Sequence, residues 1–82
     1  PDWAEGWNQR AFVHYLNQNF AAALADLDAA LDRSPRHLGA LSGKALTLTA
    51  LGREPEAQEV LRAALALNPW LPERSLLKGE AL

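Results

Sequence analysis

The chain repeats itself at a fixed spacing, which restricts it to a small group of folds. A shift of the sequence by 34 residues aligns prolines with prolines and small or apolar residues with their like: Pro1 with Pro35 and Pro69, Ala11 with Ala45, Ala23 with Ala57, and Leu27 with Leu61. Periods of about 20 to 50 residues are typical of proteins in which one structural unit stacks on the next. The chain is therefore expected to consist of stacked copies of one unit.

Each period divides into two helical stretches. In the first period, apolar residues recur at helical spacing over residues 3–18 and again over 20–31, and Pro35 follows the later stretch. The expected buried stripe of the earlier stretch is Trp7, Ala11, His14 or Tyr15, and Leu16. The second period predicts helices over residues 38–51 and 54–67, with a turn at Gly52 between them. Each period is thus predicted to form a helical hairpin.

Composition agrees with an all-helical chain and narrows the choice of partners. Alanine and leucine, which favour helices, dominate the sequence, and the formal net charge of −2 offers no basic field to nucleic acid or anionic lipid. No apolar run approaches the ~20 residues that span a bilayer. We therefore expect no nucleic-acid partner and no membrane span. The absence of cysteine removes thiolate chemistry and leaves the compartment undetermined.

The recurring residues follow a known pattern, W-x2-L-G-x2-Y, then A-x3-F, then A, then P. In the first unit these positions hold Trp7, Arg10, Ala11, His14, Ala23, Leu27, Ala30 and Pro35. In the second unit they hold Leu41, Lys44, Ala45, Leu48, Ala57, Leu61, Ala64 and Pro69. The chain thus resembles the tetratricopeptide repeat, a 34-residue helix-turn-helix. This resemblance implies an all-α superhelix, or solenoid, of stacked antiparallel helical hairpins.

We expect one domain over residues 1–82, taken from a longer protein. It would comprise a repeat unit at 4–37, a second at 38–71, and a capping or partial repeat helix at 72–82 that covers the second hairpin. Two hairpins are fewer than the three or so that a stable stack usually needs, so this last helix is expected to stabilise the domain.

Small residues that recur with the period predict where helices approach most closely. On the first helices of the units these are Ala11, Ala45 and Gly79; on the second helices they are Ala23, Ala30, Ala57 and Ala64. Charged residues also recur, since Arg10, Lys44 and Lys78 share one position. Their stems are expected to pack while their heads reach carboxylates, with Arg10 meeting Asp26 or Asp28 across the hairpin.

The resemblance also implies a binding surface. In this family the first helices of the units line a concave groove, and the ligand-facing positions here are Glu5, Asn8, Phe12 and Tyr15, then Gly39, Ser42, Leu46 and Thr49. A clamp for a C-terminal carboxylate, found in some members, is not expected, because Asn8 and Phe12 stand where it needs lysine and asparagine. The predicted function is a scaffold that binds a peptide or helix of a partner protein in this groove.

Residues with catalytic or cofactor-binding spacing are not expected. The segment from Gly39 to Lys44 is one residue short of a phosphate-binding loop, and Ala45 replaces the hydroxyl that would hold Mg²⁺. His14 is expected to pack or hydrogen-bond within the core, and His37 to lie solvated in a turn. We therefore predict no cofactor, no metal and no enzymatic activity.

Two other functions remain open at this point. The repeats could serve a structural role through self-association, or they could form an ancillary region of a larger enzyme.

Overall fold

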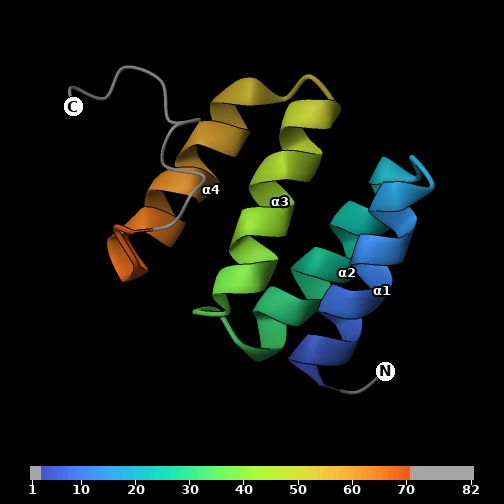
Figure 1. The fold of residues 1–82 in the computed structure, drawn as a ribbon, viewed down its shortest axis with the longest axis horizontal. Helices are drawn as coiled ribbons and strands as arrows, with labels where there is room; N and C mark the ends of the chain where they lie inside the picture. Colours follow the sequence, from blue (N-terminus) through green and yellow to red (C-terminus); the bar gives the residue numbers. More distant parts are fainter. Residues whose placement is uncertain (1–2, 71–82) are drawn as a thin grey trace.

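The computed structural model describes residues 3–70, which form four helices: α1 (Ala4–Leu16), α2 (Phe20–Arg33), α3 (Leu38–Ala50) and α4 (Glu54–Leu67). The helices pair as two antiparallel hairpins, α1 with α2 and α3 with α4, and the hairpins stand side by side (Figure 1). All regular structure in this part of the chain is helical. The predicted all-α architecture of stacked helical hairpins is therefore confirmed. The capping helix predicted at 72–82 lies outside the described residues.

The two hairpins turn in the same way. After α1, the Gln18 N–H donates to the Tyr15 carbonyl and the Asn19 N–H to the His14 carbonyl, at 2.9 and 2.8 Å. After α3, 34 residues later, Gly52 and Arg53 make the matching bonds to Thr49 and Leu48, at 3.0 and 2.8 Å. This pair of bonds is the Schellman motif, which satisfies carbonyls at a helix end and needs a left-handed residue. Gln18 is the left-handed residue in the first hairpin and Gly52 is the one in the second, with φ of 61° and 79°.

Alanines bring the helices together as the period predicts. The six alanines that were predicted to mark the close approaches of the helices are each at most 5% exposed: Ala11, Ala23, Ala30, Ala45, Ala57 and Ala64. Leu27 of α2 lies at the centre of the core, in one buried cluster with Ala11, Ala23, Ala30 and Ala40. Because Ala40 belongs to α3, this cluster joins the two hairpins into one stack.

The prediction that Leu16 is buried is wrong, since its side chain is 63% exposed. Leu16 lies five residues after Ala11, which is about 140° around the helix. The buried stripe of α1 instead runs through Ala4, Trp7, Ala11 and Tyr15, which pack on the core cluster or belong to it.

The aromatic ring of Trp7 also lies beneath two guanidinium groups, those of Arg10 and Arg33, at 4.8 and 5.6 Å from the ring centre.

Candidate partner-binding groove

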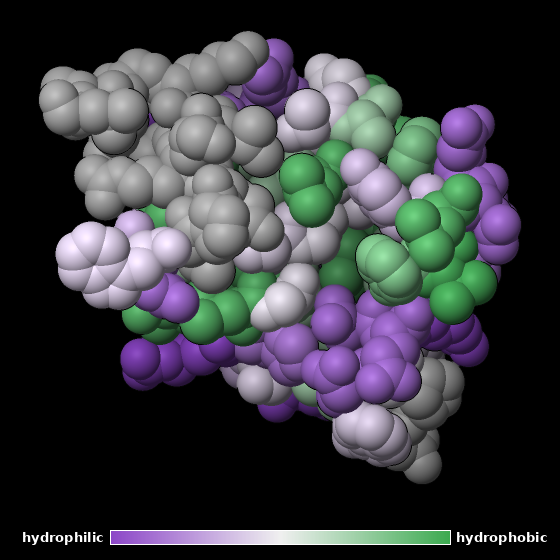
Figure 2. Space-filling view, in the orientation of Figure 1, coloured by the Kyte–Doolittle hydropathy of each residue, from purple (hydrophilic) through white to green (hydrophobic). Residues whose placement is uncertain are grey.

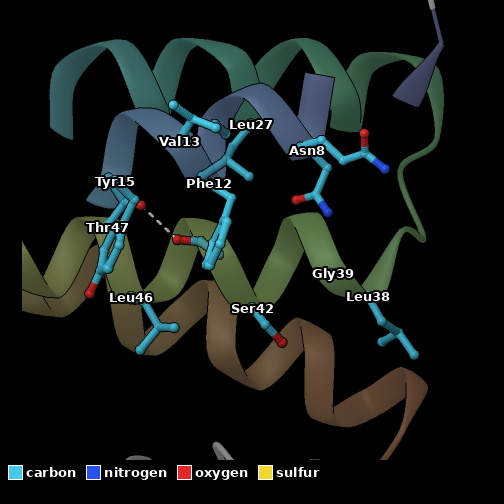
Figure 3. Close-up of a pocket in the computed structure, with 13 residues that line it drawn as sticks. Asn8, Phe12, Val13, Tyr15, Leu27, Leu38, Gly39, Ser42, Leu46 and Thr47 are labelled. Carbon is cyan, nitrogen blue, oxygen red and sulfur yellow. Dashed lines mark hydrogen bonds between the residues drawn. The ribbon is translucent and has the colours of Figure 1, made fainter. Parts of the chain in front are cut away.

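A cavity of roughly 720 Å³ lies between the two hairpins, over α1 and α3 (Figure 3). Its lining comprises Asn8, Gln9, Ala11, Phe12, Val13, Tyr15, Leu27, Leu38, Gly39, Ser42, Gly43, Leu46 and Thr47. None of these side chains carries a charge, and most are apolar. A concave, largely apolar site of this size with a few polar groups is the usual form of a ligand pocket.

Two glycines of α3 make room for the cavity. Gly39 and Gly43 lie one helical turn apart, so they share one face of α3. A Cβ atom on Gly39 would lie 3.1 Å from the Asn8 side-chain nitrogen, and one on Gly43 would lie 3.2 Å from a Leu27 methyl carbon. The absent side chains therefore allow α1 and α2 to approach α3 closely.

The mouth of the cavity is apolar. Phe12 is 62% exposed and reaches from α1 toward α3, where Leu46 and Ser42 lie (Figure 3). Figure 2 shows hydrophobic residues gathered over the C-terminal half of α1, on the side next to α3, with hydrophilic residues over its N-terminal end. An exposed aromatic ring at the edge of an apolar hollow is a feature of sites where a partner buries a side chain.

Polar groups without partners lie along the same cavity. The Asn8 amide on α1 and the Ser42 hydroxyl on α3 make no hydrogen bond or ion pair with other side chains or with the backbone in the described part of the chain. Both residues are half-buried. An amide can donate and accept, so Asn8 is able to bond a peptide group of an incoming chain.

The rear wall of the cavity is held by Tyr15 and Thr47. The Tyr15 ring meets Phe20 of α2 edge to face, with ring centres 5.4 Å apart. Thr47 is fully buried, and its hydroxyl donates to the Gly43 carbonyl at 2.7 Å, a bond drawn in Figure 3. Sequence reasoning missed Thr47, although its position four residues after Gly43 placed it on the same face of α3.

Two of the side chains that the resemblance assigned to the groove do not line this cavity. Glu5 instead places Oε1 2.9 Å from His37 Nε2, at the end of the stack. Thr49 is exposed, and its hydroxyl donates to the Ala45 carbonyl at 2.9 Å. Asn8, Phe12, Tyr15, Gly39, Ser42 and Leu46 do come together around it.

His37 has a structural role that the sequence did not indicate. It is the N-cap of α3, where its Nδ1 accepts the Ala40 N–H at 3.0 Å while its Nε2 faces Glu5 of α1. Its side chain is only 20% exposed, so the prediction of a solvated histidine is wrong. The imidazole ties the first turn of α3 to α1 because it can bond through both of its ring nitrogens.

Ion pairs lie beside the cavity rather than in it. Arg10 binds the buried carboxylate of Asp26 within the first hairpin, as predicted, and Lys44 Nζ lies 2.7 Å from Asp28 Oδ1 between the hairpins. The hydrogen bonds from Arg10 hold the pKa of the Asp26 carboxyl below its ordinary value, against the opposing effect of burial. His14 Nε2 stands 3.5 Å from the same carboxylate, and the His14 side chain is 30% exposed.

Within residues 3–70, none of the helices combines the length and the apolar character needed to cross a membrane. In the same part of the chain, no three His, Asp or Glu side chains come together in a way that could hold a metal ion.

Stacked hairpins of this kind define an α-helical repeat protein, with an open apolar surface between units. The family follows from comparison: the chain belongs to the tetratricopeptide repeat family, whose model matches residues 14–81. A TPR repeat-containing protein of Rhizobium etli is 41% identical over 54 residues, which are 66% of this chain and 26% of that protein. The chain thus spans about a quarter of that relative's length. No solved structure matched the chain.

Membership of this family indicates, in general terms, a scaffold for interaction between proteins, and such repeats are typically non-catalytic.

Proposed function

We propose that the chain binds an uncharged, apolar segment of a partner protein, either a peptide or a helix, in the cavity between α1 and α3. The single observation that carries this proposal is Phe12, an aromatic side chain that is 62% exposed at the mouth of a cavity with no charged side chain in its lining. Aromatic residues next to a pocket are enriched among the side chains that dominate binding energies. We further propose that the chain itself has no catalytic role.

The lining restricts the chemistry of the bound segment. A charged side chain that entered this cavity would lose its water and gain no counter-ion, which is costly. An apolar side chain would cover Phe12, Leu46 and Leu38 and remove their surface from water, at about 25 cal/mol per Å². The proposed segment therefore presents at least one large apolar side chain and no charge at the point of entry.

Polar contacts would set the register of the segment. Asn8 and Ser42 lie on opposite helices of the cavity, and neither side chain has a partner in the described part of the chain. A peptide backbone that runs between them offers both an N–H and a carbonyl. We propose that Asn8 bonds such a peptide group, because leaving that group unbonded in a buried site would cost about 1–3 kcal/mol.

Peptides selected from a random displayed library on the immobilised chain provide a direct test. We expect Phe12→Ala to weaken their binding by about 30-fold, which corresponds to about 2 kcal/mol. Leu16→Ala is the matched control: Leu16 is on the same helix, is 63% exposed and does not line the cavity, so its variant should bind like the wild type. Equal binding by both variants would show that the selected peptides occupy another surface.

The same measurement at several salt concentrations tests the chemistry of the site. Because the lining is uncharged, the Kd of a selected peptide should change less than about twofold between low and high salt. Light scattering over a range of protein concentrations separates this function from self-association. A dimer that Phe12→Ala abolishes would identify the cavity as a contact between two copies instead.

A further inference from the structure

His37, in the link between the hairpins, is held by two hydrogen bonds that fix its protonation state. Its Nδ1 accepts the Ala40 N–H at 3.0 Å, so this nitrogen carries no proton. The ring is therefore neutral, and its Nε2–H donates to Glu5 Oε1 at 2.9 Å. Both nitrogens of a charged imidazole are donors, so this pattern of bonds exists only while the ring is neutral.

The charged groups around the ring are unevenly placed. α1 presents the Glu5 carboxylate to Nε2. On the side of α2, the nearest charged residues along the chain are Arg33 and Arg36, both exposed. The first charged residue of α3, Lys44, is bound to an aspartate of α2. A positive charge on the ring of His37 would therefore be attracted to α1 and repelled by the positive N-terminal end of α3.

Protonation of the ring would exchange one of its bonds for a stronger form of the other. The added proton goes to Nδ1, where it faces the Ala40 N–H, so the helix loses its N-cap. The contact with Glu5 becomes an ion pair between charged groups at the same time, which keeps the ring on α1. The first turn of α3 is then no longer tied to the ring.

This first turn of α3 forms one end of the cavity. Leu38 and Gly39 both line it, as does Asn8 of α1 (Figure 3). The packing there is close, because a Cβ on Gly39 would lie 3.0 Å from His37 Cε1 and 3.1 Å from Asn8 Nδ2. A movement of the ring or of this turn would therefore change the part of the cavity where Asn8 is proposed to bond a partner segment.

We propose that His37 is a pH-sensitive cap, which holds the first turn of α3 in the shape that binds a partner segment and releases it when the ring is protonated. Histidine changes its charge between about pH 5 and pH 8, where ordinary carboxylates are largely ionised. Binding in the cavity should therefore weaken as the pH falls through this range. The effect on binding rests on the proposed function, whereas the release of the turn does not.

Amide hydrogen exchange in the free chain tests the release of the turn. The Ala40 N–H has no partner within the helix, so its protection depends on the cap. His37→Asn keeps a capping acceptor that does not titrate. The ratio of the Ala40 exchange rates, wild type over His37→Asn, should rise by at least about threefold between about pH 7.5 and about pH 5.5. A ratio that stays constant with pH would overturn the proposal.

Peptide titrations test the consequence for the cavity, with a selected peptide that lacks Asp, Glu and His and that Phe12→Ala weakens. Its Kd should rise about threefold from about pH 7.5 to about pH 5.5 in the wild type, and by less than about 1.5-fold in His37→Asn. His14→Asn is the matched control, since His14 is the other histidine of the chain and does not line the cavity. This variant should keep the wild-type response.

A response that persists in His37→Asn, or that disappears in His14→Asn, would overturn the assignment to His37. Faster exchange of the Ala40 N–H with an unchanged Kd would overturn the link between the cap and the cavity. Selected peptides that all ignore Phe12→Ala would instead count against the proposed function, and the exchange of the free chain would still decide whether the turn is released.

Discussion

Arg10 holds the carboxylate of Asp26 with two parallel hydrogen bonds, Nε to Oδ2 and Nη2 to Oδ1, each 2.8 Å long. Asp26 is only 5% exposed, whereas the Arg10 side chain is 49% exposed. A carboxylate removed from water needs charged or hydrogen-bonding partners to stay ionised. Arg10 on α1 supplies the partner that the buried Asp26 carboxylate on α2 needs. The pair therefore links the two helices.

Removal of Arg10 should destabilise the fold more than removal of the whole pair. In Arg10→Met the Asp26 carboxylate stays buried without its main partner, and this should lower the urea concentration at the midpoint of unfolding. The double variant Arg10→Leu with Asp26→Val should recover most of the loss, because an apolar pair needs no partner. Valine is the residue at the place of Asp26 in the second hairpin. A double variant as unstable as the single would contradict this account.

Acid should weaken the fold through the same carboxyl. The pKa of Asp26 is lower in the folded chain than its ordinary value of about 4, because Arg10 stabilises the charged form. The stability that ionised Asp26 adds to the fold is therefore fully present above the pKa of Asp26 in the unfolded chain. It is lost as the pH falls through the pKa of Asp26 in the folded chain. Urea midpoints measured from pH 7 down to about pH 3 should fall more steeply for the wild type than for Asp26→Asn. Parallel profiles would exclude this carboxyl as the source.

His37 should stabilise the start of α3. His37→Ala removes the acceptor of the Ala40 N–H and the contact with Glu5, and should cost about 1 kcal/mol of unfolding free energy. His37→Asn keeps a capping acceptor but cannot reach Glu5, so it should recover part of the loss. Thermal unfolding of the three chains at neutral pH measures the difference. A His37→Ala variant with the wild-type Tm would show that the cap contributes nothing.

The two turns make a matched pair for a test of backbone strain. Gln18 has a φ of 61°, a left-handed conformation that costs an ordinary residue about 1 kcal/mol, whereas glycine holds the same place in the second hairpin. Gln18→Gly should therefore stabilise the fold by about 0.5–1 kcal/mol, and Gly52→Gln should destabilise it by a similar amount. Both are measured as shifts of the Tm. A fall in the Tm of Gln18→Gly would mean that the Gln18 side chain makes a stabilising contact.

The helices and their pairing could be predicted because they depend on residues close together in sequence. Apolar spacing indicated four helices within residues 3–70, and recurring alanines marked the contacts between them. Leu16 shows the limit of this reasoning, since a stripe of apolar residues on α1 does not reveal which of them faces a neighbour. Its exposure depends on where α2 and α3 lie around α1.

The candidate groove was only partly predictable. The family resemblance named Asn8, Phe12 and Leu46, which do line the cavity, but it also named Glu5 and Thr49, which do not. The resemblance indicates which positions along the first helix of each unit face a ligand. The depth and limits of the cavity depend instead on the approach of α1 to α3, which glycines of α3 and Leu27 of α2 permit.

By itself, the sequence determined the period, the helical hairpins and the small residues at their contacts, because these follow from local spacing and side-chain size. Only the tertiary structure decided that Arg10 binds Asp26 while Lys44 binds Asp28, and that His37 caps α3 against Glu5. Such pairs join residues far apart in the chain. Their formation depends on the angle and separation at which packed helices meet, and no local pattern encodes those two quantities.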